Sequence, residues 1–265
     1  MTLKSKKNDF AIVTGAAGFL GEVHCECVLM NNCNLIMLDI NNKKLNFLSK
    51  KLKKIFPLLQ VEKYRIDITN LKKIQSLKKK FFREKKFIKV LINNACVDPK
   101  PSNYKNNNQA YTLKSWNREI DVGLKGSFLI IENFVDGMIK FKKGSIINIA
   151  SDLSVIAPNQ SIYKNVYKNF EKPVTYSVIK HGLIGMTKYY AAKFAKFNIT
   201  CNAISPVGVQ NNQNKKFVKN LINLIPMRRM ATKEDIKHVI SFLLSEKQRF
   251  ITGQNIIIDG GRTII

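Results

Sequence analysis

The segment Phe10-Ala11-Ile12-Val13-Thr14-Gly15-Ala16-Ala17-Gly18-Phe19-Leu20-Gly21 carries the strongest indication of the fold. Its first five residues suit a buried strand, and they lead directly into a glycine-rich turn that opens a helix. Glycines permit a tight turn and let the backbone approach a pyrophosphate closely, while the helix N-terminus offers free N–H groups and a partial positive charge. We therefore expect a phosphate-binding turn, with a dinucleotide against Gly15, Gly18, Phe19 and Leu20.

A second apolar run, residues 35–39, ends in Asp39, 18 positions after Gly21. An acidic side chain at that distance accepts hydrogen bonds from the adenosine ribose of a dinucleotide. Its negative charge would repel a 2′-phosphate, so Asp39, followed by Ile40, predicts NAD rather than NADP as the cofactor. The alternative is that Asp39 only caps the helix that follows.

Short apolar runs alternate with longer, lysine-rich stretches along the whole chain. Several runs are nearly continuous in Val, Ile and Leu, which indicates strands buried on both faces of a parallel sheet, and the stretches between them are long enough for crossover helices. No linker or internal repeat divides the chain. We therefore predict one α/β domain over residues 1–265, a doubly wound Rossmann-type parallel sheet of about seven strands with helices on both faces. The expected strands are residues 10–14, 35–39, 61–67, 89–93, 145–150, 199–205 and 255–259.

Three stretches have the composition of loops. Residues 98–108 are polar and contain two prolines, residues 152–174 lie between the fifth expected strand and a helix, and residues 209–226 start polar and then turn amphipathic. Ligands of such folds bind beyond the carboxyl ends of the strands. We therefore expect residues 152–174 to form an active-site loop and residues 209–226 a substrate loop.

The formal net charge of +27 raises the question of nucleic acid or an anionic membrane as a partner. The excess is mostly Lys spread over expected helix surfaces, and Asn, Ile and Phe are abundant as well. All four residue types have A/T-rich codons, so a compositional bias of the genome explains the charge. We expect no nucleic-acid partner and no membrane partner.

The remaining composition indicates a cytoplasmic location. No apolar run reaches about 18 residues, and the N-terminal segment lacks the features of a signal peptide. The five cysteines are odd in number and form no Cys-x-x-Cys pair, which favours reduced thiols and predicts no metal site.

Tyr176 and Lys180 in the run Tyr176-Ser177-Val178-Ile179-Lys180 stand one turn apart on the same face of an expected helix. An ammonium near a phenol lowers the phenol pKa from about 10 towards the working pH. Such a phenol can give or take a proton at a carbonyl or alcohol oxygen. Alone, the pair carries little weight, because this spacing occurs by chance on many surface helices.

Together with the glycine turn, the pair makes the chain resemble a short-chain dehydrogenase/reductase over nearly its whole length. Asn93-Asn94-Ala95 is similar to the family's Asn-Asn-Ala-Gly segment, with Cys96 in place of the glycine. Asn148-Ile149-Ala150-Ser151 resembles the strand that ends in the catalytic serine of the family. Ser205-Pro206-Val207-Gly208 resembles the Pro-Gly segment that lines the nicotinamide, and Ile256-Ile257-Ile258-Asp259-Gly260-Gly261 resembles the last strand.

The resemblance implies an NAD(P)-dependent oxidoreductase that interconverts a carbonyl and an alcohol. In such an enzyme Tyr176 is the general acid or base, Lys180 lowers the pKa of Tyr176 and binds the nicotinamide ribose, and Ser151 hydrogen-bonds the substrate oxygen. Asp67 is expected at the adenine, or alternatively as a cap of the next helix. The full set of expected cofactor contacts is Gly15, Gly18, Phe19, Leu20, Asp39, Ile40, Asp67, Ile68, Asn94, Ala95, Tyr176, Lys180, Pro206, Val207 and Val209.

A closer resemblance covers residues 151–160 and 172–182, which look like the flagellin-modification branch of the family. Enzymes of that branch are associated with cytoplasmic synthesis of sialic-acid-like sugars for surface glycans, which implies a sugar-like substrate. The resemblance also implies a homodimer or homotetramer, because family members usually assemble through the helices around residues 113–140 and 176–196. One alternative is a 3-oxoacyl-[acyl-carrier-protein] reductase, because Pro226-Met227-Arg228-Arg229-Met230 resembles a segment common in such enzymes. Another is a non-catalytic Rossmann module that senses a cofactor or scaffolds a complex.

Three departures from the family pattern stand out. The middle glycine of the turn is Gly18, and Phe19 takes the usual glycine place. The gap of 25 residues between Ser151 and Tyr176 is longer than in the common short form of the family. Gly123 stands where the family usually carries a catalytic asparagine. In family members that asparagine holds the relay water mainly through its backbone carbonyl, so the resemblance leaves open whether a glycine there relays protons, and it does not affect Ser151, Tyr176 and Lys180.

Overall fold

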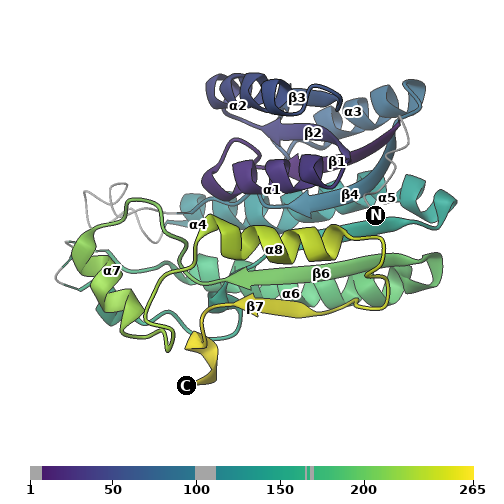
Figure 1. Cartoon of the computed structure of the whole chain (residues 1–265). Helices are drawn as coiled ribbons and strands as arrows, with labels where there is room; N and C mark the ends of the chain where they lie inside the picture. The colour runs from purple at the N-terminus through teal and green to yellow at the C-terminus, as the bar shows by residue number, and fades with distance from the viewer. Residues whose placement is uncertain (1–7, 99–111, 165, 168–169) are drawn as a thin grey trace.

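The computed structural model describes residues 8–98, 112–164, 166–167 and 170–265 (Figure 1). Seven strands form one sheet in the order β3-β2-β1-β4-β5-β6-β7, and every pair of neighbours is parallel. The chain winds from β1 to one edge and from β4 to the other, so the predicted doubly wound α/β fold is confirmed. The strands are β1 Asp9–Thr14, β2 Asn34–Asp39, β3 Val61–Arg65, β4 Phe87–Asn93, β5 Gly144–Ile149, β6 Ile199–Pro206 and β7 Asn255–Ile258.

The inner strands are buried along their lengths, as their continuous apolar runs predict. The third strand ends at Arg65 rather than at residue 67, because Asp67 turns to accept hydrogen bonds from Thr69. Apart from Asp98, the expected loop of residues 98–108 lies outside the described residues.

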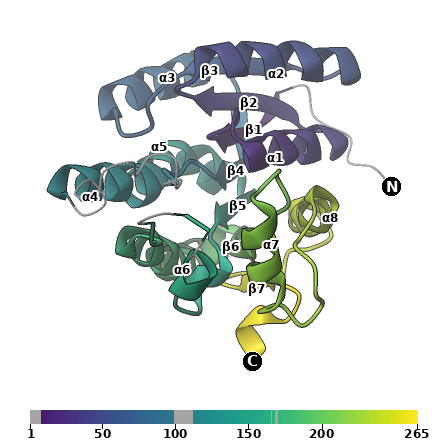
Figure 2. The same ribbon diagram turned by 90° about the vertical axis from the view of Figure 1, so that its left-hand side faces the viewer.

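Helices cover both faces of the sheet (Figure 2). Alternate residues of β1 face opposite sides: Ala11 and Val13 pack with α1, α2 and α8, whereas Phe10 and Ile12 pack with α3, α5 and α6. Burial of both sets fixes the register of the central strand. The helices are α1 Phe19–Met30, α2 Asn42–Ile55, α3 Leu71–Arg83, α4 Leu113–Ile120, α5 Gly126–Phe141, α6 Val174–Phe194, α7 Lys215–Ile222 and α8 Lys233–Leu244.

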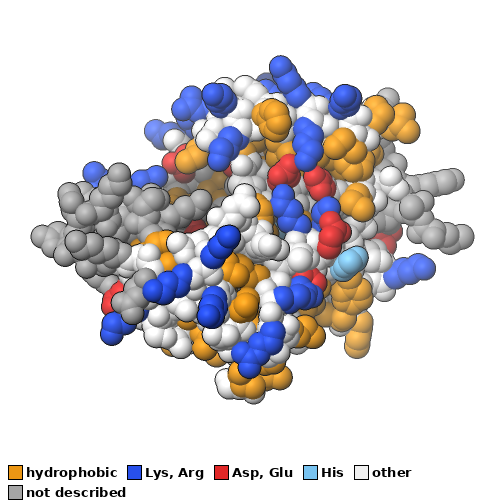
Figure 3. Space-filling view, turned by 60° about the vertical axis from the view of Figure 1, so that its left-hand side comes forward, with side chains coloured by type: hydrophobic (Ala, Val, Ile, Leu, Met, Phe, Trp, Pro, Cys, Tyr) orange, Lys and Arg blue, Asp and Glu red, His pale blue; other side chains and the backbone are white. Residues whose placement is uncertain are grey.

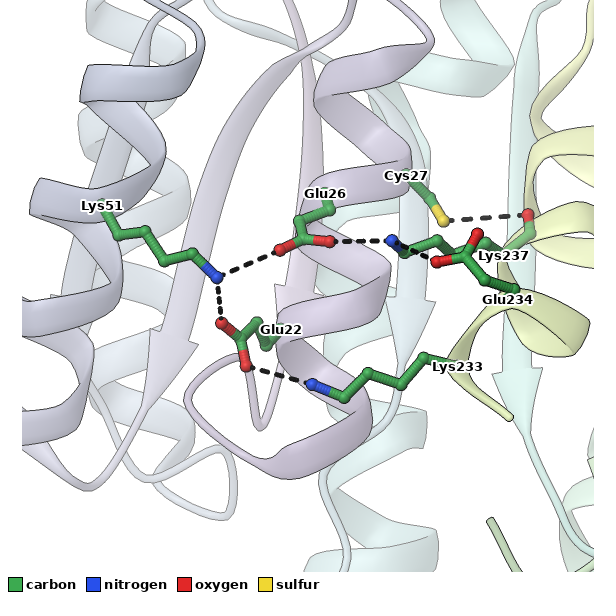
Figure 4. Close-up of polar contacts among 7 residues, drawn as sticks. All are labelled: Glu22, Glu26, Cys27, Lys51, Lys233, Glu234 and Lys237. Carbon is green, nitrogen blue, oxygen red and sulfur yellow. Dashed lines mark hydrogen bonds and ion pairs between the residues drawn. The ribbon is translucent and has the colours of Figure 1, made fainter. Parts of the chain in front are cut away.

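A network of charged side chains joins α2, α1 and α8 on one face of the sheet (Figure 4). Lys51 of α2 lies 2.7 Å from Glu22 and 3.3 Å from Glu26 of α1, and Lys237 of α8 lies 3.2 Å from Glu26. The side chains are partly exposed, so each pair contributes at most about 1 kcal/mol. Their shared effect is to align α1, whose N-terminus follows the glycine turn.

Lysine and arginine side chains lie in several separate groups on the face drawn in Figure 3, with hydrophobic and acidic side chains between them. This distribution is typical of solvated helix surfaces rather than of a continuous basic groove. Among the described residues, no helix is both long enough and apolar enough to span a membrane.

Gly21 allows α1 to pack against the glycine turn, because a Cβ at this position would lie 2.1 Å from the Gly15 carbonyl oxygen. We expect Gly21→Ala to lower the free energy of unfolding by about 1–3 kcal/mol, the usual cost of overpacking, as measured by urea denaturation. Gly137→Ala on α5 is the matched control, since the nearest atom to its Cβ is a Phe87 ring carbon at 3.5 Å. Equal stability of the two variants would contradict the close packing of α1.

Candidate active site

The glycine turn is tied to the end of β4 by Asn94. The Asn94 side-chain amide donates to the carbonyl oxygens of Thr14, at 3.0 Å, and Gly15, at 3.1 Å. The Thr14 hydroxyl accepts from the backbone N–H groups of Asn94 and Ala95. Gly15 has a φ of +60°, and a Cβ there would lie 2.8 Å from the Ala95 Cα. Glycine is therefore required at position 15 by both conformation and space.

The N-terminus of α1 has the properties of an anion site. Its N-cap is Gly18, which provides no side chain to cap the first N–H groups of the helix. A Cβ on Gly18 would come within 3.1 Å of the Gly15 carbonyl oxygen, so a side chain would crowd the turn. Gly15, Gly18, Phe19 and Leu20 all line the large cavity described below. The turn thus fits the pyrophosphate of a dinucleotide.

Asp39 at the end of β2 is held in a fixed orientation. Its carboxylate accepts hydrogen bonds from Ala17 N at 2.9 Å and from Asn41 N at 2.8 Å, which joins β2 to the glycine turn. The helix-cap alternative for Asp39 is wrong, because Asn41 is the N-cap of α2. Likewise Asp67 accepts from Thr69, and Asn70 is the N-cap of α3.

One cavity of about 1380 Å³ extends along the carboxyl ends of the strands. It brings together Ser151, Tyr176 and Lys180 with every residue expected at the cofactor, although these come from positions spread along the whole sequence. The predicted cofactor contacts that line it are Gly15, Gly18, Phe19, Leu20, Asp39, Ile40, Asp67, Ile68, Asn94, Ala95, Tyr176, Lys180, Pro206, Val207 and Val209.

Two lysines lie near the ring of Tyr176. Lys180 Nζ is buried, donates to the Ile149 carbonyl oxygen at 2.8 Å and lies 5.4 Å from the ring centroid of Tyr176. Lys172 Nζ is closer, at 3.9 Å from the same centroid, and it forms an ion pair with Asp98 at 2.5 Å. A cation over an aromatic face is attracted by the electrons of the ring. Lys172 is therefore the nearer of the two cations to the tyrosine ring.

The pKa of Tyr176 is raised well above its ordinary value, first by burial and then by the negative charge of Asp98. The net shift is therefore upward, and the expected lowering by Lys180 stays a prediction. The cause is tertiary: burial disfavours the phenolate, and a carboxylate from the end of another strand adds to that effect. Spacing along one helix reveals neither influence.

Ser151 lies at the end of β5 and is buried. Its hydroxyl donates to the Asp152 carboxylate at 2.8 Å and accepts from Leu153 N at 3.2 Å. Asp152 in turn pairs with Arg262 of the C-terminal turn, and both of these side chains are buried in the cavity wall. The sequence predicts Ser151 but not this pair, because residues 152 and 262 are far apart in the chain.

Gly123 lies in a π-helical turn, Asp121–Lys125, between α4 and α5. A Cβ there would come within 2.5 Å of the Ile179 side chain, so a larger residue would require Ile179 of α6 to move. The Gly123 carbonyl oxygen accepts a hydrogen bond from the Ser127 hydroxyl at 3.0 Å, and its neighbours Asp121 and Val122 line the cavity whereas Gly123 does not. The expected relay at Gly123 stays a prediction, and its carbonyl already has one partner.

Aromatic side chains join the expected active-site loop to the expected substrate loop, which contains α7. Tyr163 of the 152–174 loop stacks on Phe217 of α7, with ring centroids 5.4 Å apart, and packs edge-on against Phe170 at 5.1 Å. Tyr167 contacts both phenylalanines. The Asn220 side chain also donates to the Ile162 carbonyl oxygen at 3.1 Å. These rings form an aromatic wall of the cavity, and no pattern in the sequence indicates it.

Comparisons with known proteins agree with this architecture. Residues 15–263 match the family model described as Enoyl-(Acyl carrier protein) reductase. An NAD-dependent glycerol dehydrogenase of Listeria innocua is 31% identical over 284 residues, with 100% of each chain covered. The 3-oxoacyl-[acyl-carrier-protein] reductase FabG of Thermotoga maritima is 29% identical, with 96% of this chain and 97% of that protein covered.

Two further similarities concern a flagellin enzyme and a solved structure. The Post-translational flagellin modification protein A of Campylobacter coli is 28% identical over 96% of this chain and 98% of that protein. The crystal structure of a short chain dehydrogenase from Leptospira borgpetersenii with bound NAD⁺ has a TM-score of 0.83 and 28% identity, covering 99% of this chain and 97% of that one.

We expect Asp98→Asn to lower the pKa of Tyr176, because the change removes a nearby negative charge and leaves the Lys172 ammonium without its carboxylate. The measurement is a pH titration of tyrosine ¹³C chemical shifts, with Tyr176→Phe identifying the signal. Asp136→Asn, which alters an exposed ion pair with Lys78, is the control. An unchanged or higher Tyr176 pKa in Asp98→Asn would refute the electrostatic role of Asp98.

Proposed function

The chain belongs to the short-chain dehydrogenase/reductase family and is an oxidoreductase with a nicotinamide cofactor, and we propose that it interconverts a carbonyl and an alcohol on a sugar-like substrate in surface-glycan synthesis. The single observation that carries the proposed chemistry is that Ser151, Tyr176 and Lys180 line the same cavity as the glycine turn. We further propose NAD as the preferred cofactor, a cytoplasmic location and a homo-oligomer.

The bound nicotinamide supplies or accepts the hydride. In the proposed mechanism the Tyr176 hydroxyl gives a proton to the substrate oxygen during reduction, or takes one from it during oxidation. The Ser151 hydroxyl turns to donate to that oxygen and stabilises its developing charge. Lys180, anchored on the Ile149 carbonyl oxygen, would hold the cofactor ribose through its remaining N–H groups and would add positive charge beside Tyr176.

The substrate end of the cavity supports a sugar-like ligand. The rings of Tyr163, Tyr167 and Phe217 line it, together with the amide side chains of Asn159 and Gln213. A sugar ring offers C–H groups to aromatic faces and hydroxyls to amides, so this combination suits it. The similarity to a flagellin modification protein at 28% identity supports the same proposal.

A 3-oxoacyl-[acyl-carrier-protein] reductase is the second candidate. The same aromatic wall offers apolar area to an acyl chain, and a reductase of that kind is 29% identical to this chain. Asp39 argues against it, because reductases of that kind usually use NADPH. The cavity lining between residues 38 and 69 contains the fixed Asp39 carboxylate and no lysine or arginine. The Asp39 carboxylate would repel the 2′-phosphate of NADPH, and no positively charged side chain in this part of the lining would bind it.

The proposed homo-oligomer would form on α5 and α6. Phe128 of α5 and Tyr189 of α6 are exposed beside Gly185 and Met186, and these residues line a shallow groove between the two helices. Leu183, Tyr190 and Ala191 face the core instead, so only part of the predicted α6 interface is available to a partner. The proposed cytoplasmic location is supported by the cysteines, all five of which are free.

Tyr176→Phe tests the proposed chemistry. The assay uses NAD with polyols, amino-sugars and their nucleotides, and NADH with keto-sugars and their nucleotides. An acetoacetyl thioester is tested beside them with NADH and NADPH. We expect turnover of a sugar-like compound by the wild type. The variant should lose at least about 10²-fold in kcat, the usual contribution of general acid–base catalysis, while its affinity for NADH stays unchanged. Turnover by Tyr176→Phe at the wild-type rate would refute the role of Tyr176, and preference for the thioester would favour the reductase alternative.

Asp39→Asn tests the cofactor preference. The two oxygens of Asp39 accept separately from Ala17 N and Asn41 N, and asparagine retains only one of them, so the variant removes the negative charge together with one of these hydrogen bonds. We expect wild type to bind NADH more tightly than NADPH in a fluorescence titration. The variant should narrow that difference by about tenfold, equivalent to about 1.4 kcal/mol of charge repulsion. Tighter binding of NADPH by the wild type would overturn the proposed role of Asp39.

A further inference from the structure

The pair formed by Asp152 and Arg262 lies directly behind the proposed catalytic serine. Ser151, Asp152 and Arg262 are exposed by only 5%, 2% and 7%, and all three line the cavity. A buried ion pair is seldom a net source of stability, because removing two charges from water costs several kcal/mol per ion. Its position against Ser151 suggests a different role.

The hydrogen bonds of Ser151 are nearly all committed. A hydroxyl has one proton and two lone pairs. The Ser151 proton points to the Asp152 carboxylate, which can only accept, and Leu153 N donates to one lone pair. The other lone pair is left for the Tyr176 side chain, with which Ser151 also forms a hydrogen bond. Ser151 therefore has to release Asp152 before it can donate to a substrate oxygen.

We propose that Asp152 and Arg262 are positioning residues that control when the Ser151 hydroxyl is available to the substrate. Asp152 keeps the Ser151 hydroxyl in one orientation by accepting its hydrogen bond. The positive charge of Arg262 partly neutralises the Asp152 carboxylate, which weakens that hydrogen bond enough for a substrate to replace it. When a substrate oxygen arrives, the hydroxyl turns to it, and the carboxylate keeps Arg262 and Leu153 N as its partners. This inference rests on the function proposed above.

The C-terminal turn is built to place Arg262. The Asp259 carboxylate accepts from Gly261 N at 2.9 Å and from Thr263 N at 2.6 Å, which folds the chain back just after β7 (Figure 1). Gly260 and Gly261 have φ values of +63° and +91°, a conformation that side chains disfavour. The last residues of the chain therefore take part in the active site through Arg262.

Titratable groups around Asp152 define a test by pH. Burial raises the pKa of Asp152, while the charge of Arg262 and the Ser151 hydrogen bond lower it. The other titratable groups that sense Asp152 are Tyr163 and Tyr176. Without Arg262, burial acts with less opposition, and the pKa of Asp152 moves further up. Above that pKa the carboxylate holds Ser151 more tightly than in wild type, and below it the neutral carboxyl releases the hydroxyl.

The experiment compares Arg262→Met, Arg262→Lys and the double variant Asp152→Asn/Arg262→Met, using the panel compound that wild type turns over fastest. For Arg262→Met we expect a new descending limb in the pH profile of kcat and a loss of about tenfold above it, less than the 10²–10³ that removal of an oxyanion donor costs. Arg262→Lys should stay within about threefold of wild type, and the double variant should lose the new limb and recover part of kcat. Arg228→Met is the control for loss of an exposed arginine.

An unchanged pH profile in Arg262→Met, or a double variant no faster than Arg262→Met, would overturn the proposal. The affinity for NADH and the thermal midpoint of unfolding distinguish these outcomes from misfolding. If Arg262→Met or the double variant does not fold, the single variants Arg262→Lys and Asp152→Asn take its place. A measurement without substrate is the pH titration of the Asp152 Cγ chemical shift, assigned with Asp152→Asn. A higher pKa of Asp152 in Arg262→Met supports the electrostatic coupling between Asp152 and Arg262, and an unchanged pKa refutes it. This test holds even if no panel compound is turned over and the proposed function fails.

Discussion

The hydrogen bonds from the Asn94 side chain to the Thr14 and Gly15 carbonyl oxygens hold together the two strands at which the winding of the sheet reverses. They fix the left-handed backbone of Gly15 and bring the start of α1 to the cavity. Asp39 binds the other side of the same turn through Ala17 N. A nucleotide site in this fold lies at the reversal of strand order because the loops there separate and leave a crevice. The side chains of Asn94 and Asp39 give that crevice a rigid wall.

From that wall the cavity passes to the groups that would carry the chemistry, and there burial opposes charge. Ser151, Asp152 and Lys180 are almost inaccessible, and burial also raises the pKa of Tyr176. Two unit charges about 5 Å apart interact by about 3 kcal/mol at an effective dielectric constant of about 20. The charge of a single carboxylate or ammonium in this region is therefore sufficient to change the protonation state of a neighbouring group or the direction of its hydrogen bond. Asp98, Asp152, Lys172 and Arg262 are all close enough to take part.

The sequence predicted the features that depend on local pattern. Short apolar runs located the seven strands to within about two residues. The runs of the inner strands are nearly continuous because a strand buried on both faces must be apolar throughout, whereas the edge strand β3 is partly exposed and carries charged residues. The glycine turn was equally readable, since Gly15 and Gly21 are required by the backbone of the turn itself. Contacts between distant segments were not readable. Arg262 reaches Asp152 across 110 residues, and the reason for glycine at position 123 is the side chain of Ile179 on another helix. The direction of the Tyr176 pKa shift depends on burial, which spacing does not encode.

The two unpredicted ion pairs explain how a chain with a net charge of +27 can keep a balanced site. Lys172 is matched by Asp98 beside Tyr176, and Arg262 is matched by Asp152 beside Ser151. If either cation were unpaired, it would favour anions over a neutral hydroxyl or carbonyl at the reacting position. Each of these cations is paired with a carboxylate, whereas Lys180 contacts the backbone of β5 through the Ile149 carbonyl oxygen. In the proposed mechanism, pairing would therefore leave Lys180 as the main source of positive charge at the substrate oxygen, and the aromatic wall and the amide side chains would select the substrate.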